Sequence, residues 1–252
     1  MSLPDILSTT SYSASTHRRE GLDILDIWFD SGVSWATVLG VENSPADLYL
    51  EGIDQFSGWF YSSLLTSIAL TDQAPYNRIF VHGFALDEKR NKMSKSVGNV
   101  VSPRDVVEGK AMGVDVLRWW VASHASSNTS VMVGDNNPTA SKTEVDRMRN
   151  TLRFILGQLE GAVEEELTEE RRVLLDRALL DRLLKYITVC GQFYEAMEYN
   201  KVCIATTNFL TSLSSSYIHP VKDRLYCDSR SSLGWRSGAG HHAGAGEKTN
   251  FS

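Results

Sequence analysis

Lys92-Met93-Ser94-Lys95-Ser96 is the most informative segment of this sequence. It brings two ammonium groups and two hydroxyls together, between a charged run at 87–91 and a glycine at position 98. Ammonium groups on a short, mobile segment suit a polyphosphate leaving group, because the negative charge of that group rises as its bond breaks. A solvated surface loop without a chemical role is the other interpretation of five such residues. The neighbouring segments decide between the two.

Two short apolar segments precede the lysine stretch, and each ends in a polar residue followed by glycine. Residues 47–50 are predicted to form a buried strand that ends at Glu51-Gly52, and residues 77–81 a second strand that ends at His82-Gly83. In open α/β sheets, nucleotides bind at the edge formed by the carboxyl ends of the strands. Glycine lets the backbone approach a ligand closely there. These features favour a nucleotide-binding α/β fold.

The remaining segments of the first half are predicted from the same patterns. Asp54 and Gln55 open a helix, because apolar residues follow them at helical spacing as far as Ile68. The apolar run 24–29, closed by the turn residues 30–32, is predicted to be a further core strand.

From Ser141 onward the pattern becomes purely helical, which predicts a helical bundle. Beside its first helix, Arg147, Arg149 and Arg153 are candidates for contacts to an RNA backbone, with a solvated helix face as the equal alternative. From Asp228 the chain is rich in Ser and Gly without periodicity and is predicted to be disordered. Three apolar stripes define the bundle: Met148, Leu152, Ile155, Leu159 and Val163; Leu180, Leu183, Leu184, Ile187, Cys190, Tyr194 and Met197; and Val202, Ala205, Phe209 and Leu213.

The composition sets limits on function. Of 252 residues, 42% are hydrophobic and 22% charged, as in ordinary globular proteins, and no apolar run is long enough to cross a membrane. The net charge of −6 gives no overall attraction to nucleic acid, although a local basic face can still bind RNA. Cys190, Cys203 and Cys227 form no CxxC pair, so neither a disulfide framework nor a zinc site is expected, and no other metal site is predicted.

The lysine stretch matches, letter for letter, the KMSKS signature of class I aminoacyl-tRNA synthetases. Other stretches resemble the isoleucyl-tRNA synthetases of that class, in wording closer to the bacterial and mitochondrial type than to the eukaryotic cytosolic one. Valyl-tRNA synthetases share the architecture and remain an alternative. The stretches are Asp23 to Gly32 (DILDIWFDSG), Tyr49 to Gln55 (YLEGIDQ) followed by Gly58-Trp59-Phe60, His82-Gly83-Phe84, and Asp115 to Ser123 (DVLRWWVAS).

The resemblance implies an α/β part followed by an all-α part: the C-terminal half of a Rossmann-like nucleotide-binding domain and a partial helical anticodon-binding bundle. It also implies a ligase reaction in which isoleucine and ATP form isoleucyl-adenylate, and the amino acid then passes to tRNA(Ile). A mitochondrial matrix location is expected, with the cytoplasm as the alternative. The predicted boundaries are 1–20 for a linker or truncated segment, 21–125 for the catalytic half, 126–140 for a connection, 141–227 for the bundle and 228–252 for the tail.

Site residues follow from the resemblance, position by position. Lys92 and Lys95 are expected to stabilise the departing pyrophosphate, Lys95 most directly, and Mg²⁺ would accompany ATP. Glu51 is expected to contact the adenylate. The other implied positions are Gly52, Asp54 and Gln55 in the adenylate pocket, and His82, Gly83, Met93, Ser94 and Ser96 beside the ATP.

The sequence also departs from the family pattern. Phe56-Ser57 stand where many members have a His-Arg pair, and Pro220 falls where a helix should continue and is predicted to break it. None of the six histidines lies in a His-x-Gly-His pattern, which belongs to the first half of this nucleotide-binding fold. The chain is therefore expected to be an internal piece that cannot form adenylate alone. A non-catalytic RNA-binding remnant is the second hypothesis.

Overall fold

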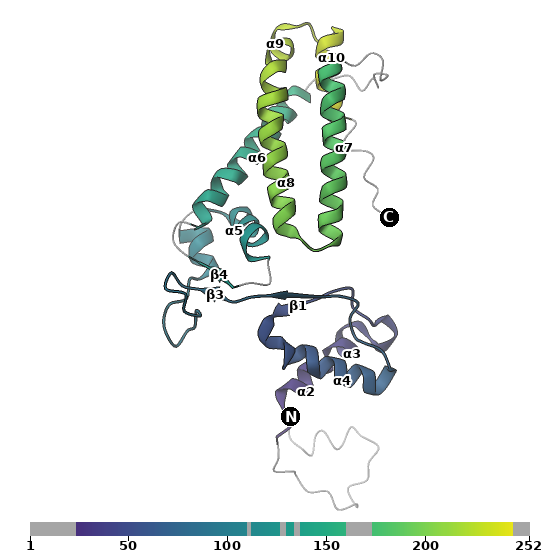
Figure 1. Ribbon diagram of the computed structural model, residues 1–252, viewed down its shortest axis with the longest axis vertical. Coiled ribbons are helices and arrows are strands. Elements are labelled where there is room, and N and C mark those ends of the chain that lie inside the picture. Colours follow the sequence, from purple (N-terminus) through teal and green to yellow (C-terminus); the bar gives the residue numbers. More distant parts are fainter. Residues whose placement is uncertain (1–23, 110–111, 127–129, 134–136, 160–172, 244–252) are drawn as a thin grey trace, which may run out of the picture. The chain divides into compact units, whose positions relative to one another are not determined.

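The computed structural model describes residues 24–109, 112–126, 130–133, 137–159 and 173–243, which fall into two compact units (Figure 1). The first unit contains the described residues up to Tyr49 together with Asp54–Ile79, and the second contains Leu50–Ile53 and the described residues from Phe80 onward. The predicted segment 1–20 and Val163 of the first apolar stripe lie outside the described residues.

Small side chains bring the helices of the first unit together. A Cβ atom on Gly32 would come within 2.9 Å of the Cβ of Ser62, so the backbones of α2 and α4 approach closely. Ser63 and Ser67 are fully buried on the same helix, α4. The unit contains α2 (Ile27–Gly32), α3 (Ser34–Leu39), a 3₁₀ turn at Val41–Asn43, α4 (Trp59–Thr71), and the last three residues of a second 3₁₀ turn (Ile53–Phe56).

Tryptophan side chains fix the packing of α4. The indole of Trp35 is buried and donates a hydrogen bond to Thr66 Oγ1 at 3.1 Å. The indole of Trp59 donates to the backbone oxygen of Ser31 at 3.0 Å, and its ring stacks on Tyr49 with the ring centroids 4.1 Å apart. These paired polar atoms satisfy groups that burial would otherwise leave unbonded. The predicted helix after Gln55 is confirmed by α4.

The prediction of a core strand at residues 24–29 is wrong. The segment enters helix α2 at Ile27, and the side chain of Asp26 caps this helix by accepting a hydrogen bond from the backbone N–H of Trp28 at 2.9 Å. An aspartate N-cap satisfies one of the free N–H groups of a first helical turn. Ile24 is 95% exposed, so the apolar run is not part of a core.

The described residues contain four short strands, which make two sheets of two strands each. β1 (Tyr49–Gly52) pairs with β2 (Ile79–His82), which confirms the two predicted strands with a shift of two residues. β3 (Ala85–Leu86) pairs in parallel with β4 (Val131–Met132). β4 lies inside the segment 126–140 that was predicted to be a polar connection, so part of that segment has a structural role.

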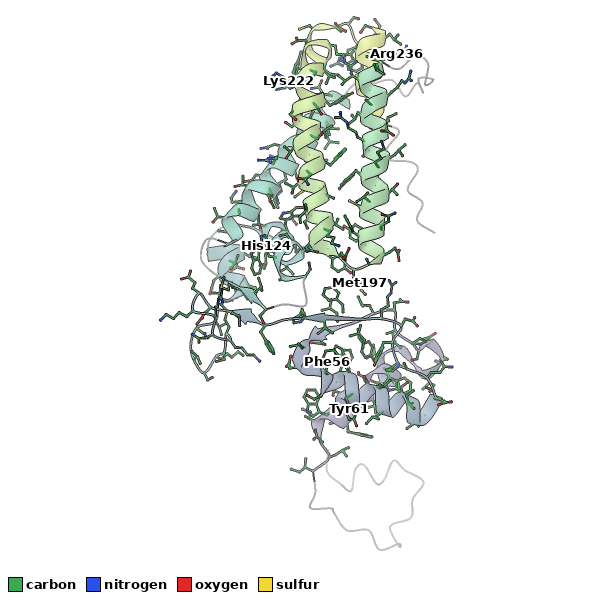
Figure 2. The ribbon with its side chains drawn as sticks, in the orientation of Figure 1. Phe56, Tyr61, His124, Met197, Lys222 and Arg236 are labelled. Atoms are coloured by element: carbon green, nitrogen blue, oxygen red, sulfur yellow. The ribbon has the colours of Figure 1, made fainter. Side chains whose placement is uncertain are left out.

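The helical prediction from Ser141 is confirmed by the second unit. α7 and α8 pack side by side and are joined by a tight turn in which Met197 has a φ of +55° (Figures 1 and 2). The helices are α5 (Val114–Trp120), α6 (Asn137–Leu159), α7 (Leu174–Glu195), α8 (Tyr199–Leu213), α9 (His219–Cys227) and α10 (Leu233–Ala243), with π-helical turns at Asp105–Gly109, Val121–Ala125 and Ser214–Ile218.

Pro220 does not break the helix, contrary to the prediction. The π turn at Ser214–Ile218 leads directly from α8 into α9, and Pro220 lies in the first turn of α9. Within this turn the backbone N–H of His219 donates to the oxygen of Ser214, five residues earlier. This wider pattern shifts the hydrogen bonds by one residue, so the helix can continue past a residue that has no N–H to donate.

The prediction of disorder from Asp228 onward is wrong for residues 233–243, which form α10. Trp235 is buried in the same core cluster as Leu179, Val221 and Leu225. The hydroxyl of Ser237 donates to Asp176, which is fully buried and also accepts from Tyr217 at 2.8 Å and from the guanidinium of Arg224. Tertiary contacts thus hold a segment whose composition alone favours disorder. Residues 244–252 lie outside the described residues.

Two of the three predicted apolar stripes are partly out of phase with the buried faces of their helices. On α6, Leu152 is exposed, whereas Val145 and Thr151 are buried. On α7, Leu184 and Tyr194 are exposed. The third stripe is confirmed, since Val202 and Leu213 are buried, with Phe209 packed against the core.

Candidate functional site

The carboxyl ends of β1 and β2 bring Glu51-Gly52 and His82-Gly83 to one edge of a sheet. The two strands run in the same direction, because Ala46 bridges to Tyr76 in parallel and the pairing continues from there. Gly52 is buried while the side chain of Glu51 is exposed. The two strand ends that carry glycine therefore lie at the same edge of the sheet, as predicted.

The ring of His82 has a defined hydrogen bond. Its Nδ1 atom lies 2.9 Å from the backbone oxygen of Gly83. A carbonyl oxygen only accepts, so Nδ1 carries the proton and donates. In the neutral ring, Nε2 is then an acceptor that can receive a hydrogen bond from a ligand.

Asp87 and Asn99 hold the two ends of the lysine loop, which is defined here as residues 87–99. Asp87 accepts hydrogen bonds from the backbone N–H groups of Lys89 at 2.9 Å and Asn91 at 2.7 Å, and from the side-chain amide of Asn99 at 2.9 Å. Asn99 accepts in turn from the backbone N–H of Ser94 at 3.0 Å. The bond from Asn99, followed by the backbone bonds, lowers the pKa of the Asp87 carboxyl.

The two signature lysines have different environments. The ammonium of Lys92 lies 3.5 Å from the ring centroid of Phe84, a cation–π contact that holds it close to strand β3. The side chain of Lys95 is exposed, and it makes no ion pair with any residue in the described ranges. Lys95 is thus the freer of the two cations to meet an incoming phosphate.

The serines and the glycine of the loop form a turn. The Oγ atoms of Ser94 and Ser96 are 3.1 Å apart, and the backbone N–H of Gly98 donates to the oxygen of Ser94 at 3.2 Å. Gly98 has a φ of +74°, a conformation that suits a residue without a Cβ atom. This turn presents Lys95 and Ser96 at its exposed end, whereas Met93 is half-buried and bonds through its N–H to Ala85.

Asp54 and Gln55 belong to the first unit, where Gln55 has a structural contact. Its side-chain oxygen accepts a hydrogen bond from the backbone N–H of Trp59 at 3.2 Å, at the start of α4. Its amide nitrogen is 3.5 Å from Asp54, whose side chain is exposed. Gln55 therefore stabilises the first turn of α4, the helix that the sequence predicted it to open.

The three candidate RNA-binding arginines on α6 are bonded to different partners. Arg149 forms an ion pair with Asp115 at 2.8 Å and lies 3.8 Å from Asp146. Arg153 donates to the side chain of Asn150 at 3.4 Å. Arg147 donates to the hydroxyl of Thr211 at 3.2 Å. The charge of Arg149 is compensated by carboxylates, whereas Arg147 and Arg153 are bonded to neutral groups.

The described residues contain neither a metal-binding cluster nor a membrane-spanning helix. No group of three or more His, Cys, Asp or Glu side chains in these ranges could hold a metal ion. Among the helices that the structure describes, none combines the length and apolar character needed to cross a membrane.

Residues 5–133, just over half of the sequence, match the family described as tRNA synthetases class I (I, L, M and V). The chain belongs to the class I tRNA synthetases. Residues 176–239 match a second family, the anticodon-binding domain of tRNA ligase. This match begins in α7 and includes most of α10, so it reaches into the segment 228–252 that was predicted to be a tail.

Curated relatives of this synthetase chain include bacterial and mitochondrial proteins. A mitochondrial isoleucine–tRNA ligase from Mus musculus is 41% identical over 234 residues, which is 89% of this chain and 23% of the relative. An isoleucine–tRNA ligase from Synechococcus is 42% identical over 250 residues, which is 94% of this chain and 26% of the relative. The chain thus spans about a quarter of the length of these relatives.

Solved structures support the synthetase fold. A ternary complex of LeuRS, tRNA and LeuAMS from Agrobacterium radiobacter matches with a TM-score of 0.73 and 18% identity, over 94% of this chain and 31% of that chain. Methionyl-tRNA synthetase from Mycobacterium tuberculosis bound by methionyl-adenylate matches with a TM-score of 0.59 and 20% identity, over 79% of this chain and 39% of that chain. At such low identity, the similarity shows the fold alone.

Proposed function

We propose that this chain is part of an isoleucine–tRNA ligase, which forms isoleucyl-adenylate from isoleucine and ATP and then transfers the amino acid to tRNA(Ile). The observation that carries the proposal is the 41–42% identity to relatives that have this name, from a mouse mitochondrion and from a bacterium. The intact signature at 92–96 agrees with it. A valine-specific enzyme of the same class is the closest alternative.

The lysine loop would act when pyrophosphate leaves. Lys95 is exposed and unpaired within the described residues, so its ammonium can move to the β- and γ-phosphates as their charge rises. Asp87 and Asn99 position the loop through hydrogen bonds rather than by touching the substrate. Positioning and charge stabilisation supply most of the rate in phosphoryl-type displacements, so a loop with fixed ends and a free lysine fits this task.

The sheet edge would hold the adenylate. Glu51 offers an exposed carboxylate that can accept from the amino group of isoleucine, and His82 offers Nε2 beside Gly83. Gly52, Asp54 and Gln55 are proposed adenylate-binding residues as well. Magnesium would arrive with ATP and be held through its phosphates, because the described residues contain no cluster of protein ligands for it. The mitochondrial matrix is the proposed compartment.

A segment exchange tests the proposed activity. Residues 24–239 of this chain would replace the matching segment of the Synechococcus isoleucine–tRNA ligase, and isoleucine-dependent ATP–pyrophosphate exchange would be measured. We expect exchange with isoleucine and charging of tRNA(Ile). Exchange that depends on valine instead would overturn the assignment of isoleucine as the substrate. A soluble, folded chimera without any exchange would overturn the proposed catalytic function.

The chain by itself is expected to show no exchange above background, because its 252 residues contain no His-x-Gly-His. RNA binding without catalysis is the second candidate function. Phe56-Ser57, in place of the His-Arg pair of many family members, favour it. A chimera that binds tRNA(Ile) but does not activate isoleucine would support this second candidate.

A further inference from the structure

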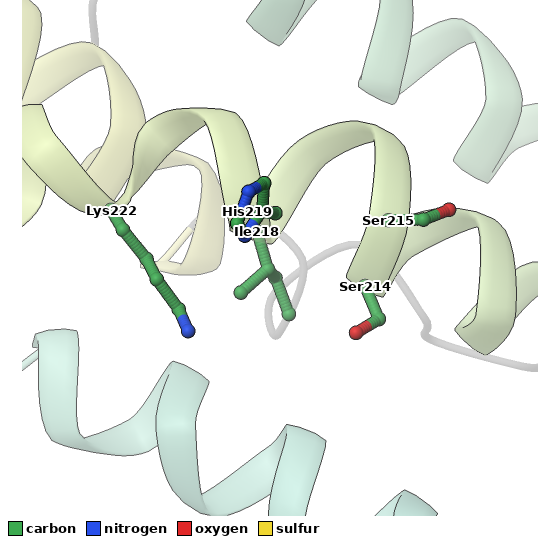
Figure 3. A pocket seen from close by; sticks show the side chains of 5 residues that line it. All are labelled: Ser214, Ser215, Ile218, His219 and Lys222. Atoms are coloured by element: carbon green, nitrogen blue, oxygen red, sulfur yellow. The ribbon is translucent and has the colours of Figure 1, made fainter.

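The π turn and the first turn of α9 carry a polar pocket that none of the candidate site residues explains. Its volume is about 310 Å³, and it is lined by Ser214, Ser215, Ile218, His219 and Lys222 (Figure 3). This volume lies at the small end of the range of about 300–1,000 Å³ for ligand pockets. A phosphate with part of a sugar would fit such a space better than a large cofactor.

Helical spacing arranges the lining residues in two adjacent rows. Ser214, Ile218 and Lys222 are four residues apart, and Figure 3 shows their side chains pointing to the same side. Ser215 and His219 form the second row, which begins one turn earlier at Thr211. The π turn that ends at Ile218 joins the two helical parts of this surface, and such turns are frequent at functional sites.

Three of the side-chain donors that line the pocket have no hydrogen-bond partner among the described residues. Lys222, His219 and the hydroxyl of Ser214 are bonded to no side chain or backbone group of the residues that the structure describes. Ser215 is different, because its hydroxyl donates to the oxygen of Thr211 at 3.0 Å. An ammonium, a ring N–H and a hydroxyl that converge on one space are suited to the oxygens of a phosphate.

The electrostatic surroundings also favour an anion. Helix α6 passes both ends of the rows: Arg147 bonds to Thr211 at 3.2 Å, and the ring of Phe154 lies 6.5 Å from that of Tyr226, one turn beyond Lys222. The acids of α6 are bonded elsewhere, Glu144 to Trp119 at 2.6 Å and Asp146 to Lys142 at 2.6 Å. A carboxylate does lie close in sequence, at Asp223, but one residue along a helix turns it about 100° away from Lys222.

Other lysines of the bundle contrast with Lys222. Lys185 forms an ion pair with Asp181 at 2.7 Å, and Lys201 with Glu198 at 2.6 Å, so a carboxylate compensates each charge. Lys222 has no such partner in the described residues, and Figure 2 places it on α9. The exposed ring of Tyr226 on the same row could stack on a base. Cations with an exposed aromatic residue are typical of an RNA-binding surface.

We propose that this pocket binds a phosphate of an RNA backbone, with Lys222, His219 and Ser214 as donors and Arg147 continuing the contact toward Thr211. The inference rests on the proposed function, since tRNA(Ile) would supply the phosphate, and it adds a specific contact site to that function. Residues 176–239, which match an anticodon-binding domain, include all five lining residues.

Fluorescence anisotropy with a labelled tRNA(Ile) transcript tests the pocket in the full 252-residue chain. We expect Lys222→Ala to weaken binding roughly fivefold and to reduce the salt slope of the binding constant by about 1, because one phosphate contact is lost. Lys185→Ala is the matched control, since it removes the same charge from an exposed, paired site, and it should change the affinity less than about twofold. Ser214→Ala tests the pocket without a change of charge and should weaken binding about twofold.

Equal effects of Lys222→Ala and Lys185→Ala on tRNA affinity would overturn the proposal that the pocket binds an RNA phosphate. The proposed function of the chain would not be affected by that result. No binding of tRNA by the unaltered chain would overturn the RNA assignment and count against the proposed function as well. Inorganic phosphate and AMP form a third arm, read by the NMR signals of the His219 ring. If either shifts these signals at the concentrations at which tRNA does, the site binds a free phosphate and the RNA assignment is wrong.

Discussion

Asp87 and Asp176 are two carboxylates that each accept several hydrogen bonds, in very different surroundings. Asp87 lies on the surface and bonds to two backbone N–H groups and to Asn99. Asp176 is fully buried and bonds to Tyr217, Arg224 and Ser237, so it joins α7 to the π turn, α9 and α10. The same chemistry therefore shapes the lysine loop in one place and fixes helices in the other. Burial decides how much each carboxylate contributes to stability.

The largest effect is expected from Asp176→Asn. Loss of its charge leaves the guanidinium of Arg224 largely buried without a counter-charge, which costs about 3–5 kcal/mol in buried pairs. Urea unfolding of the full chain measures this as a drop in the free energy of unfolding. The control is Asp181→Asn, which breaks the exposed pair with Lys185 and should cost less than about 1 kcal/mol. Similar costs for the two variants would remove the contrast between buried and exposed carboxylates.

Lys95→Ala tests the loop that Asp87 holds, since this variant should lower catalysis and leave stability unchanged. In the chimeric ligase, we expect isoleucine-dependent pyrophosphate exchange to fall about 10²–10³-fold, the usual effect of removing one donor from a developing negative charge. Lys89→Ala, an exposed lysine of the same loop outside the signature, serves as the control and should stay within about threefold. An unchanged exchange rate in Lys95→Ala would remove Lys95 from the proposed mechanism.

A smaller effect is expected when the stability of the wild-type chain and of the variant Asp87→Asn is compared as the pH falls. The hydrogen bond from Asn99 lowers the pKa of Asp87 in the folded chain below its unfolded value of about 3.9. Its contribution to stability is therefore present above that unfolded value and is lost as the pH falls through the folded pKa. The difference in melting temperature between the wild-type chain and Asp87→Asn should shrink from pH 6 to pH 3. A constant difference would show that the charge of Asp87 does not support the loop.

The smallest effect is expected for the reactivity of the cysteine thiols, which also differs between buried and exposed positions. Burial raises the pKa of Cys203 to about 11, so this thiol stays protonated at pH 8, whereas Cys227 is exposed. A disulfide reagent should therefore label one cysteine of the folded chain quickly and all three in urea. Cys227→Ser should abolish the fast phase. Fast labelling of Cys203 in the native state would mean that α8 is not packed as described.

Local patterns predicted the elements next to the candidate site. β1, β2 and α4 follow from short apolar runs, glycine ends and helical spacing, which are properties of neighbouring residues. The lysine signature could be identified from five letters. Helix α2 was missed because one cap, Asp26, outweighs the strand propensity of the apolar run.

The residues that position the lysine loop could not be predicted from local sequence patterns. Asp87 and Asn99 are twelve residues apart, and only the folded loop brings them into contact. The one local signal was an aspartate at the start of a polar turn, which often bonds to backbone N–H groups shortly after it. Helix α10 depends on contacts of Trp235 and Ser237 with distant helices, so its Gly-rich composition gave the wrong prediction.

The π turn at Ser214–Ile218 also sets the rotational phase of the chain that follows it. Deletion of one residue there would restore an ordinary α-helical turn and rotate all of α9 by about 100° relative to α8. Arg224 would then face away from Asp176, and Lys222 would leave the row that begins at Ser214. A single additional residue thus aligns two separate surfaces of one helix, one that faces Asp176 and one that carries the proposed phosphate pocket.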